Sequence, residues 1–175
     1  SAVEAVNPSI VSVDARRRLP ATGVVWSTDG VIVTTNHVVE RDENIRIVTN
    51  DGNTHEAQLV GRDPQNDLAL LRVAGAEGLA VPNWGDNAAL KVANLVLALG
   101  KPGDQVQATL GVVSALVSAE ERAERRERRK AQMRKGGPPR RRRRMEGMSR
   151  MLSDGFIQTD VVMYPGFSGG PLVSG

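Results

Sequence analysis

The sequence predicts an all-β fold made of two small β-barrels, and three observations support this. Short apolar or alternating runs recur roughly every 8 to 12 residues, which is typical of barrels and sandwiches. Turn residues that tolerate positive φ stand between these runs, as tight hairpins require. The runs are not separated by convincing amphipathic helices, which argues against βαβ units. A length of 175 residues, 40% of them apolar, fits one domain or two small subdomains with a shared core.

The first half of the chain contains six predicted strands. They are residues 10–13, 24–26, 31–35, 45–48, 57–60 and 68–73. Asp29-Gly30 and the run Asn50-Asp51-Gly52-Asn53 supply hairpin turns between them. The stretch 61–64, Gly-Arg-Asp-Pro, is expected to be a loop.

A second set of strands follows the break at Pro82–Asp86. They are predicted at residues 94–99, 107–116, 156–159 and from 171 to 173. We therefore expect a first subdomain over residues 1–85 and a second over residues 86–175, with the boundary near residues 82–90.

Charge is strongly segregated along the chain, although the formal net charge is only +3. Residues 120–150 hold 14 of the 23 basic and 5 of the 20 acidic side chains, which leaves a net charge of −6 on the remainder. Such a body repels phosphate, so binding to nucleic acid is not expected. The stretch at about 119–150 contains five consecutive arginines, Arg140 to Arg144, and reads as an exposed insertion within the second subdomain.

Composition also excludes several kinds of site. The chain has no cysteine, so disulfides, thiolate catalysis and cysteine-based zinc sites are excluded, and only His37 and His55 carry imidazole. Neither a metal nor an organic cofactor is expected. No run approaches the roughly 18 consecutive apolar residues of a membrane span, so no transmembrane segment is predicted.

Three residues combine into a pattern that carries chemistry: His37 in TTNHVV, Asp67 in NDLALL and Ser168 in PGFSGGPL. A serine hydroxyl needs an imidazole to remove its proton during attack, and a carboxylate to hold that imidazole in the correct tautomer. The amides of Gly166 and Ser168 are candidates for an oxyanion hole. An α/β-hydrolase elbow is excluded, because its histidine follows the serine along the chain.

These motifs resemble the HtrA/DegP type of serine protease, which has the chymotrypsin fold. The resemblance runs through AVNPSIVSV, TTNHVV, NDLALLRV, TLGVVSAL and FIQTDVVMYPGFSGGPLV, and so covers nearly the whole chain. It implies a chymotrypsin/trypsin-like double β-barrel with the site between the barrels. It further implies that His37 is the general base, Asp67 its orienting residue and Ser168 the nucleophile, with the amides of Gly166 and Ser168 as the oxyanion hole.

The sequence departs from the family pattern at two places. Position 167 is Phe where the family usually has Asn or Asp, and we expect an altered surface or substrate contact there. The fold also needs further strands after the serine to close the second barrel. We therefore expect the second barrel to be incomplete in this chain.

By resemblance, the substrate pocket is formed by Val161, Val162 and Met163, with Val162 at its floor. None of these side chains is charged. Cleavage is therefore expected after small or medium aliphatic residues, because a buried cation would lack a partner there.

Two hypotheses follow for the function. The first is a serine endopeptidase that hydrolyses unfolded or damaged proteins, with an extracytoplasmic location and a homotrimeric assembly suggested by the family resemblance. The second is a catalytically incompetent, protease-like binding module whose basic insertion recruits an acidic partner. The insertion occupies a loop that is regulatory in this family, so an acidic regulatory partner is also compatible with the enzyme.

Overall fold

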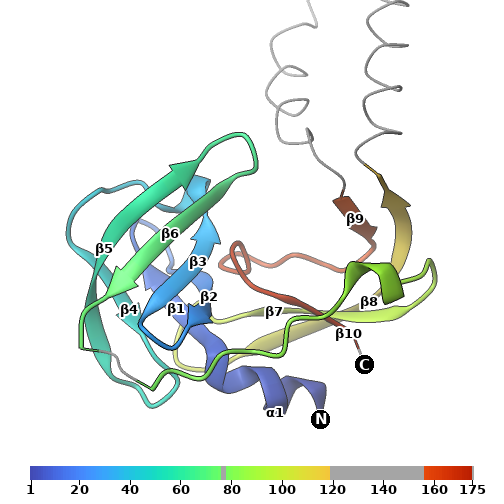
Figure 1. Cartoon of the computed structure of the whole chain (residues 1–175), viewed down its shortest axis with the longest axis horizontal. Helices are drawn as coiled ribbons and strands as arrows, with labels where there is room; N and C mark the ends of the chain where they lie inside the picture. The colour runs from blue at the N-terminus through green and yellow to red at the C-terminus, as the bar shows by residue number, and fades with distance from the viewer. Residues whose placement is uncertain (76–77, 119–155, 175) are drawn as a thin grey trace, which may run out of the picture.

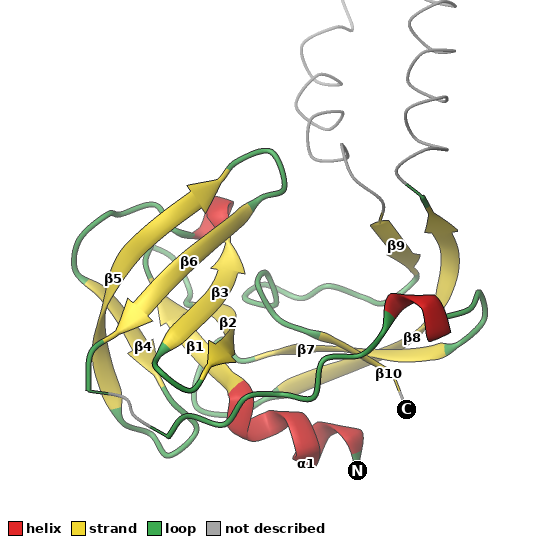
Figure 2. Cartoon of the chain, in the orientation of Figure 1, coloured by secondary structure: helices red, strands yellow, loops and turns green. Residues whose placement is uncertain are grey.

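The computed structural model describes residues 1–75, 78–118 and 156–174. In these ranges the chain forms a closed barrel and, beside it, an open sheet (Figure 1). The connection from the barrel to the sheet contains no strand in its described residues, 74–75 and 78–94, and the segment before the last strand returns from the sheet towards the barrel (Figure 2).

Six strands form the closed barrel, in the order β1-β2-β3-β6-β5-β4, and β4 pairs with β1 to close it. Their bounds are β1 Ile10–Asp14, β2 Ala21–Ser27, β3 Val31–Thr35, β4 Ile45–Val48, β5 Thr54–Asp63 and β6 Leu68–Val73. The 3-10 turn η2, Asn36–Val38, follows β3. The predicted all-β class is confirmed.

Alternating burial in β3, β4 and β6 turns one face of each of these strands into the core of the barrel. In β6 the buried residues are Ala69, Leu71 and Val73, and the residues between them face outward. Such a period of two places one face of each strand in the barrel interior. Gly23 in β2 is needed for this packing, since a Cβ there would lie 2.8 Å from the side chain of Ile32.

The second sheet has four strands in the order β10-β7-β8-β9. Their bounds are β7 Leu95–Gly100, β8 Gln107–Val117, β9 Phe156–Thr159 and β10 Leu172–Ser174, and the 3-10 turn η3, Asn87–Ala89, precedes β7. All three pairings are antiparallel. The sheet is open, and Leu95 and Leu110 are 63% and 64% exposed.

The barrel and the open sheet meet at Thr22 and Lys101. The amide of Lys101 donates to the Thr22 hydroxyl (2.7 Å), and its ammonium donates to the carbonyl of Thr49 (3.3 Å). The Lys101 side chain is buried. Burial lowers the pKa of this ammonium, and the negative charges of Asp104 and Asp51 oppose that shift.

Two features differ from the sequence expectations. A short helix, α1 (Ala2–Val6), begins the chain and continues into the 3-10 turn η1 (Asn7–Ser9), before the first predicted strand. The predicted loop at residues 61–64 is wrong, because β5 continues to Asp63. A register shift between Leu59 and Gly61 keeps this strand paired with β6.

The basic insertion predicted at about 119–150 lies outside the described residues. Among the described residues, no helix has the length and apolar character needed to cross a membrane.

Candidate active site

His37 is placed by the pairing of β3 with β6. Thr35 lies opposite Leu68 in this register, so the residues that follow β3 meet the residue that precedes β6. The amide of Asn36 donates to the carbonyl of Asp67 (3.0 Å), and the amide of His37 donates to Oδ1 of the same residue (2.8 Å). Two backbone amides therefore hold this turn against Asp67, one through its carbonyl and one through its carboxylate.

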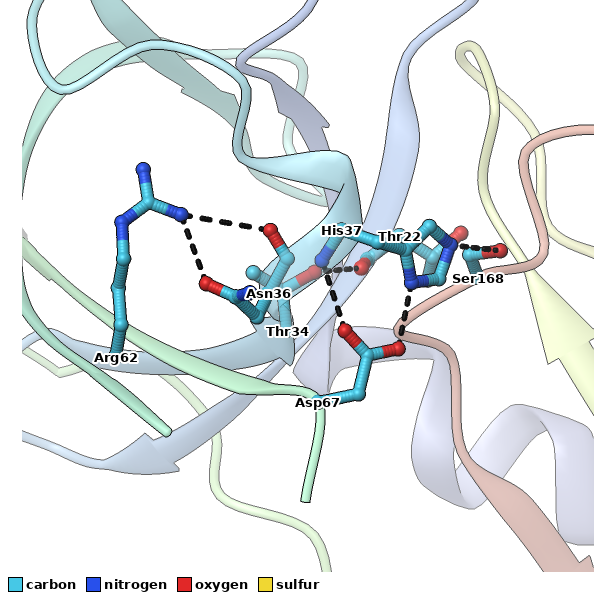
Figure 3. Close-up of polar contacts among 7 residues, drawn as sticks. All are labelled: Thr22, Thr34, Asn36, His37, Arg62, Asp67 and Ser168. Atoms are coloured by element: carbon cyan, nitrogen blue, oxygen red, sulfur yellow. Dashed lines mark hydrogen bonds and ion pairs between the residues drawn. The ribbon is translucent and has the colours of Figure 1, made fainter. Parts of the chain in front are cut away.

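The three predicted residues come together in one chain of contacts (Figure 3). Nδ1 of His37 lies 2.6 Å from Oδ2 of Asp67, and Nε2 lies 3.3 Å from Oγ of Ser168. The carboxylate can only accept, so the proton lies on Nδ1 and Nε2 faces the hydroxyl as an acceptor. The Asp67 side chain is 14% exposed, against 50% for His37. This arrangement can move the hydroxyl proton to the imidazole.

The turn before Asp67 is held by Asp63. Oδ1 of Asp63 accepts hydrogen bonds from the amides of Gln65 (3.0 Å) and Asn66 (3.2 Å), and Oδ2 accepts from the side chain of Asn66 (2.8 Å). The side-chain hydrogen bond from Asn66, followed by the backbone bonds, holds the pKa of Asp63 below its usual range. Asp67 itself has a positive φ of 55°, a conformation that aspartate tolerates better than most residues.

Arg62 supports the turn that carries His37. Its guanidinium donates to Oδ1 of Asn36 (2.9 Å) and to the carbonyl of Val39 (2.8 Å), so it holds η2 at both ends. A further bond reaches Asp42 (2.7 Å). Figure 3 shows Arg62 beside Asn36, on the side away from Ser168. Sequence analysis did not identify this residue.

Glycines shape the turn around Ser168. Gly166 and Gly169 have φ of +91° and +89°, which favours glycine. A Cβ at Gly169 would lie 2.0 Å from the carbonyl oxygen of Thr22, and one at Gly170 would lie 1.9 Å from that of Leu99. The turn therefore packs directly against the backbones of both sheets.

Thr22 binds this turn from the barrel side. Its amide donates to the carbonyl of Ser168 (3.0 Å), and its hydroxyl donates to the carbonyl of Gly166 (2.7 Å). Its own carbonyl accepts from the hydroxyl of Thr34 (2.7 Å). Sequence analysis did not identify Thr22 either, although it orients the 166–167 and 168–169 peptides of this turn.

The amides of Gly166 and Ser168 stay available for an oxyanion. Within the part of the chain that the structure describes, no protein acceptor receives a hydrogen bond from either one. Two amides that converge beside a nucleophile can stabilise a tetrahedral oxyanion.

Phe167 is buried at 1% exposure, so the expected altered surface or substrate contact is wrong. Its ring packs over Gly100, where a Cβ would lie 2.4 Å from Cδ1. It also meets Tyr164 edge to face, with 5.8 Å between ring centroids. This side chain fills the core beneath the turn, and the absence of a side chain at Gly100 makes room for it.

The three predicted pocket residues take different positions. Val161 lies over Gly111, where a Cβ would meet its side chain at 2.7 Å. Val162 is 56% exposed, and its carbonyl accepts from the hydroxyl of Thr109 (2.8 Å). Only Met163 borders the cavity next to Ser168.

That cavity has a volume of about 430 Å³. Its lining residues come from two segments: Met163, Tyr164, Pro165, Gly166 and Ser168 on one side, and Arg16, Arg18 and Leu19 on the other. The second segment is the connection between β1 and β2. No group of three or more His, Asp or Glu side chains that could hold a metal ion is found in residues 1–75, 78–118 and 156–174.

Comparison with known proteins agrees with this architecture. The family described as trypsin-like peptidase domain matches residues 21–175. A probable periplasmic serine endoprotease DegP-like of Chlamydia pneumoniae is 33% identical over 91% of this chain and 27% of its own length. A protein of the same description from Ectopseudomonas mendocina is 38% identical over 86% of this chain and 26% of its own length.

The periplasmic serine endoprotease DegP of Escherichia coli is 32% identical over 87% of this chain and 27% of its own length. The chain thus spans about a quarter of the length of the curated relatives that it matches. The resemblance to HtrA/DegP-type proteases is confirmed. Because the family match covers far more than half of the sequence, the chain belongs to the trypsin-like peptidase family.

Proposed function

We propose that this chain is the catalytic domain of a serine endopeptidase. The observation that carries the proposal is the position of the His37 imidazole between the Asp67 carboxylate (2.6 Å) and the Ser168 hydroxyl (3.3 Å). The Asp67 carboxylate orients the imidazole from one side, and the other side of the ring faces the proposed nucleophile, Ser168.

The proposed reaction has two halves. Oγ of Ser168 attacks the peptide carbonyl while Nε2 of His37 takes its proton, and the amides of Gly166 and Ser168 receive the oxyanion. His37 then gives the proton to the leaving amine, which breaks the C–N bond and leaves an acyl-enzyme. Water attacks the ester by the same proton route and regenerates Ser168. Asp67 keeps the proton on Nδ1 and stabilises the imidazolium.

We propose unfolded or damaged proteins as substrates and an extracytoplasmic location. The similarity to DegP-like proteins described as periplasmic serine endoproteases supports the location, and the HtrA/DegP resemblance supports the substrate class. The same resemblance supports a homotrimer.

For the residue before the scissile bond, we propose small or medium aliphatic side chains. The uncharged side chain of Met163, the one of the three predicted pocket residues that borders the cavity at Ser168, supports this. A peptide library in which arginine is preferred at this position would contradict it.

We also propose that the basic residues 120–150 contact an acidic regulatory partner. Their excess of nine positive charges, beside a remainder of net charge −6, supports this.

Replacing Ser168 tests the proposed activity. Ser168→Ala is expected to lower kcat/KM on an unfolded protein and on aliphatic fluorogenic peptides by about 10⁴- to 10⁶-fold, because triad members act as a unit. The midpoint temperature of thermal denaturation should change little in this variant. Ser114→Ala, at an exposed serine of β8, is the matched control and should keep the parent rate.

Labelling with a fluorophosphonate separates the enzyme from a binding module. Stoichiometric modification that disappears in Ser168→Ala supports the enzyme. Persistent inertness of the wild-type protein towards label and substrates would instead favour the protease-like binding module.

A further inference from the structure

The cavity beside Ser168 combines an apolar wall with cationic side chains. Leu19, Met163, Tyr164 and Pro165 supply the apolar part, while Arg16 and Arg18 supply two guanidinium groups. A volume of about 430 Å³ lies in the range of sites that hold small organic groups. A carboxylate on a short aliphatic stem matches both kinds of lining, because the stem packs on the apolar wall and the oxygens meet the guanidinium groups.

The charges of Arg16 and Arg18 are not paired with an acidic side chain among the described residues. Neither Arg16 nor Arg18 forms an ion pair there. The nearest acidic residue before them in the sequence, Asp14, is already paired with Arg41 (3.0 Å) and Arg46 (3.2 Å). The positive charge at the cavity is therefore not neutralised within the part of the protein that the structure describes.

The loop that carries the arginines is anchored to the site. Nε of Arg16 donates to the carbonyl of Leu19 (2.8 Å), which closes the loop on itself. The next residue, Pro20, has its carbonyl 3.0 Å from the position of a Cβ at Gly166. The loop thus lies against one of the two proposed oxyanion residues, and the Arg16 side chain is tied to that loop.

From this geometry we infer that the cavity binds an acidic side chain, Glu or Asp, of a substrate residue that flanks the scissile bond. The inference rests on the proposed endopeptidase function and names a selectivity within it. Successive residues of an extended peptide are only about 3.3 to 3.6 Å apart. When a carbonyl carbon lies at Ser168, a neighbouring side chain can therefore reach a cavity that Ser168 itself borders.

The test uses quenched fluorescent peptides that share one aliphatic cleavage site. Glu and Gln are exchanged, one position at a time, at the second and third positions before the bond and at the three positions after it. At one of them, Glu is expected to raise kcat/KM by about two- to fivefold over Gln at low salt, with the ratio falling towards 1 as salt screens the charges. A ratio near 1 at all five positions would overturn the inference.

Variants of Arg16, Arg17 and Arg18 show which side chain is responsible for the preference for Glu over Gln. Arg18→Glu should reverse the preference, so that Lys is favoured over Glu at the responsive position, and Arg16→Gln should lower the Glu-to-Gln ratio. Arg17→Gln is the matched control, because Arg17 is exposed and does not line the cavity, and it should keep the parent ratio. An equal loss in the Arg17 variant would show unspecific attraction by the basic run and overturn the assignment.

The two proposals fail in different ways. Hydrolysis of every peptide at similar rates would overturn the acidic preference and leave the endopeptidase proposal standing. If no peptide is cleaved and no fluorophosphonate label is incorporated, the endopeptidase proposal fails, and the preference that rests on it fails too.

Discussion

Thr22 connects the barrel to the turn that carries Ser168, although it contacts no reacting atom. It binds the carbonyls of Gly166 and Ser168 through its hydroxyl and amide, while its hydroxyl also accepts from the amide of Lys101. The residue is fully buried. The position of the nucleophile relative to His37 therefore depends on a side chain of the opposite sheet.

Thr22→Val should separate this positioning role from a general contribution to stability. The change keeps the shape and removes the hydroxyl, so the Gly166 carbonyl loses its donor, and the free energy of unfolding is expected to fall by about 1 to 3 kcal/mol. A shifted turn should also lower kcat about 10- to 100-fold, with a smaller change in KM. Steady-state kinetics at a temperature where the variant is folded would measure this.

Thr22→Ser is the matched control, since it keeps the hydroxyl and should keep most of the activity. A Thr22→Val variant that loses stability but turns over at the parent rate would contradict a positioning role.

Among individual residues, the sequence predicts those proposed to react better than those that hold them in position. His37, Asp67 and Ser168 stand in recognisable motifs, and the structure brings them together, while their chemical roles stay a prediction. Thr22 could not be identified, because its hydroxyl partners are 79 and 144 residues away in the chain. The burial of Phe167 depends on the space above Gly100, which no local pattern reveals.

Among the elements, the turn between β5 and β6 has the clearest effect on the site. Asp63 ends β5 and accepts three hydrogen bonds from the next residues of the turn, and Asp67 follows directly. Only the ionised carboxylate can accept all of them, which is why the pKa of Asp63 is lowered. The conformation of this turn therefore depends on pH in the acid range.

Asp63→Ala is expected to lower kcat/KM about tenfold, because the turn no longer holds Asp67 against His37. A lowered pKa means that the folded state binds the proton less readily than the unfolded state. The stabilisation by Asp63 is thus fully present above the unfolded pKa of about 3.9 and is lost as the pH falls through the folded value.

Urea denaturation of both proteins from pH 7 to pH 2.5 would check this. The difference in stability between wild type and Asp63→Ala should shrink below about pH 4. Glu43→Ala, at an exposed carboxylate outside this turn, provides the control. A difference that stays constant down to pH 2.5 would contradict the prediction.

Most strands could be predicted because they are short apolar or alternating runs with turn residues between them. Residues 31–35, 45–48, 68–73 and 156–159 were predicted with the bounds that the structure shows. Pairing order was not available from the sequence, and it is the pairing of β3 with β6 that brings His37 to Asp67. Helix α1 was missed, although Ser1 and Glu4 form a capping box whose S-x-x-E pattern is visible in the sequence.

Over the whole molecule, the excess of positive charge lies outside the strands that form the barrel and the open sheet. It falls within residues 120–150, and the rest of the chain has a net charge of −6. The division into subdomains near residues 82–90 stays a prediction, as does the homotrimer.

Deleting residues 120–148 should leave hydrolysis of short peptides within about twofold of the parent rate, since the proposed catalytic groups all lie outside this stretch. Any change of activity caused by an acidic polypeptide, with polyglutamate as the probe, should disappear. Peptide kinetics with and without polyglutamate would measure both effects. A variant with Arg140 to Arg144 replaced by Gln tests the role of the positive charge without shortening the chain. Loss of all hydrolysis in the deletion variant would contradict a purely regulatory role for residues 120–148.

The junction at Thr22 and Lys101 has a consequence for how the protein loses its structure. Local opening is least costly where few buried contacts are broken, and an open sheet at the side of a barrel would ordinarily detach first. Here the hydrogen bonds that would have to break for detachment are those that hold the Ser168 turn and the buried ammonium. The sheet and the barrel are thereby coupled into one cooperative unit, and partial unfolding of either removes the nucleophile from its base.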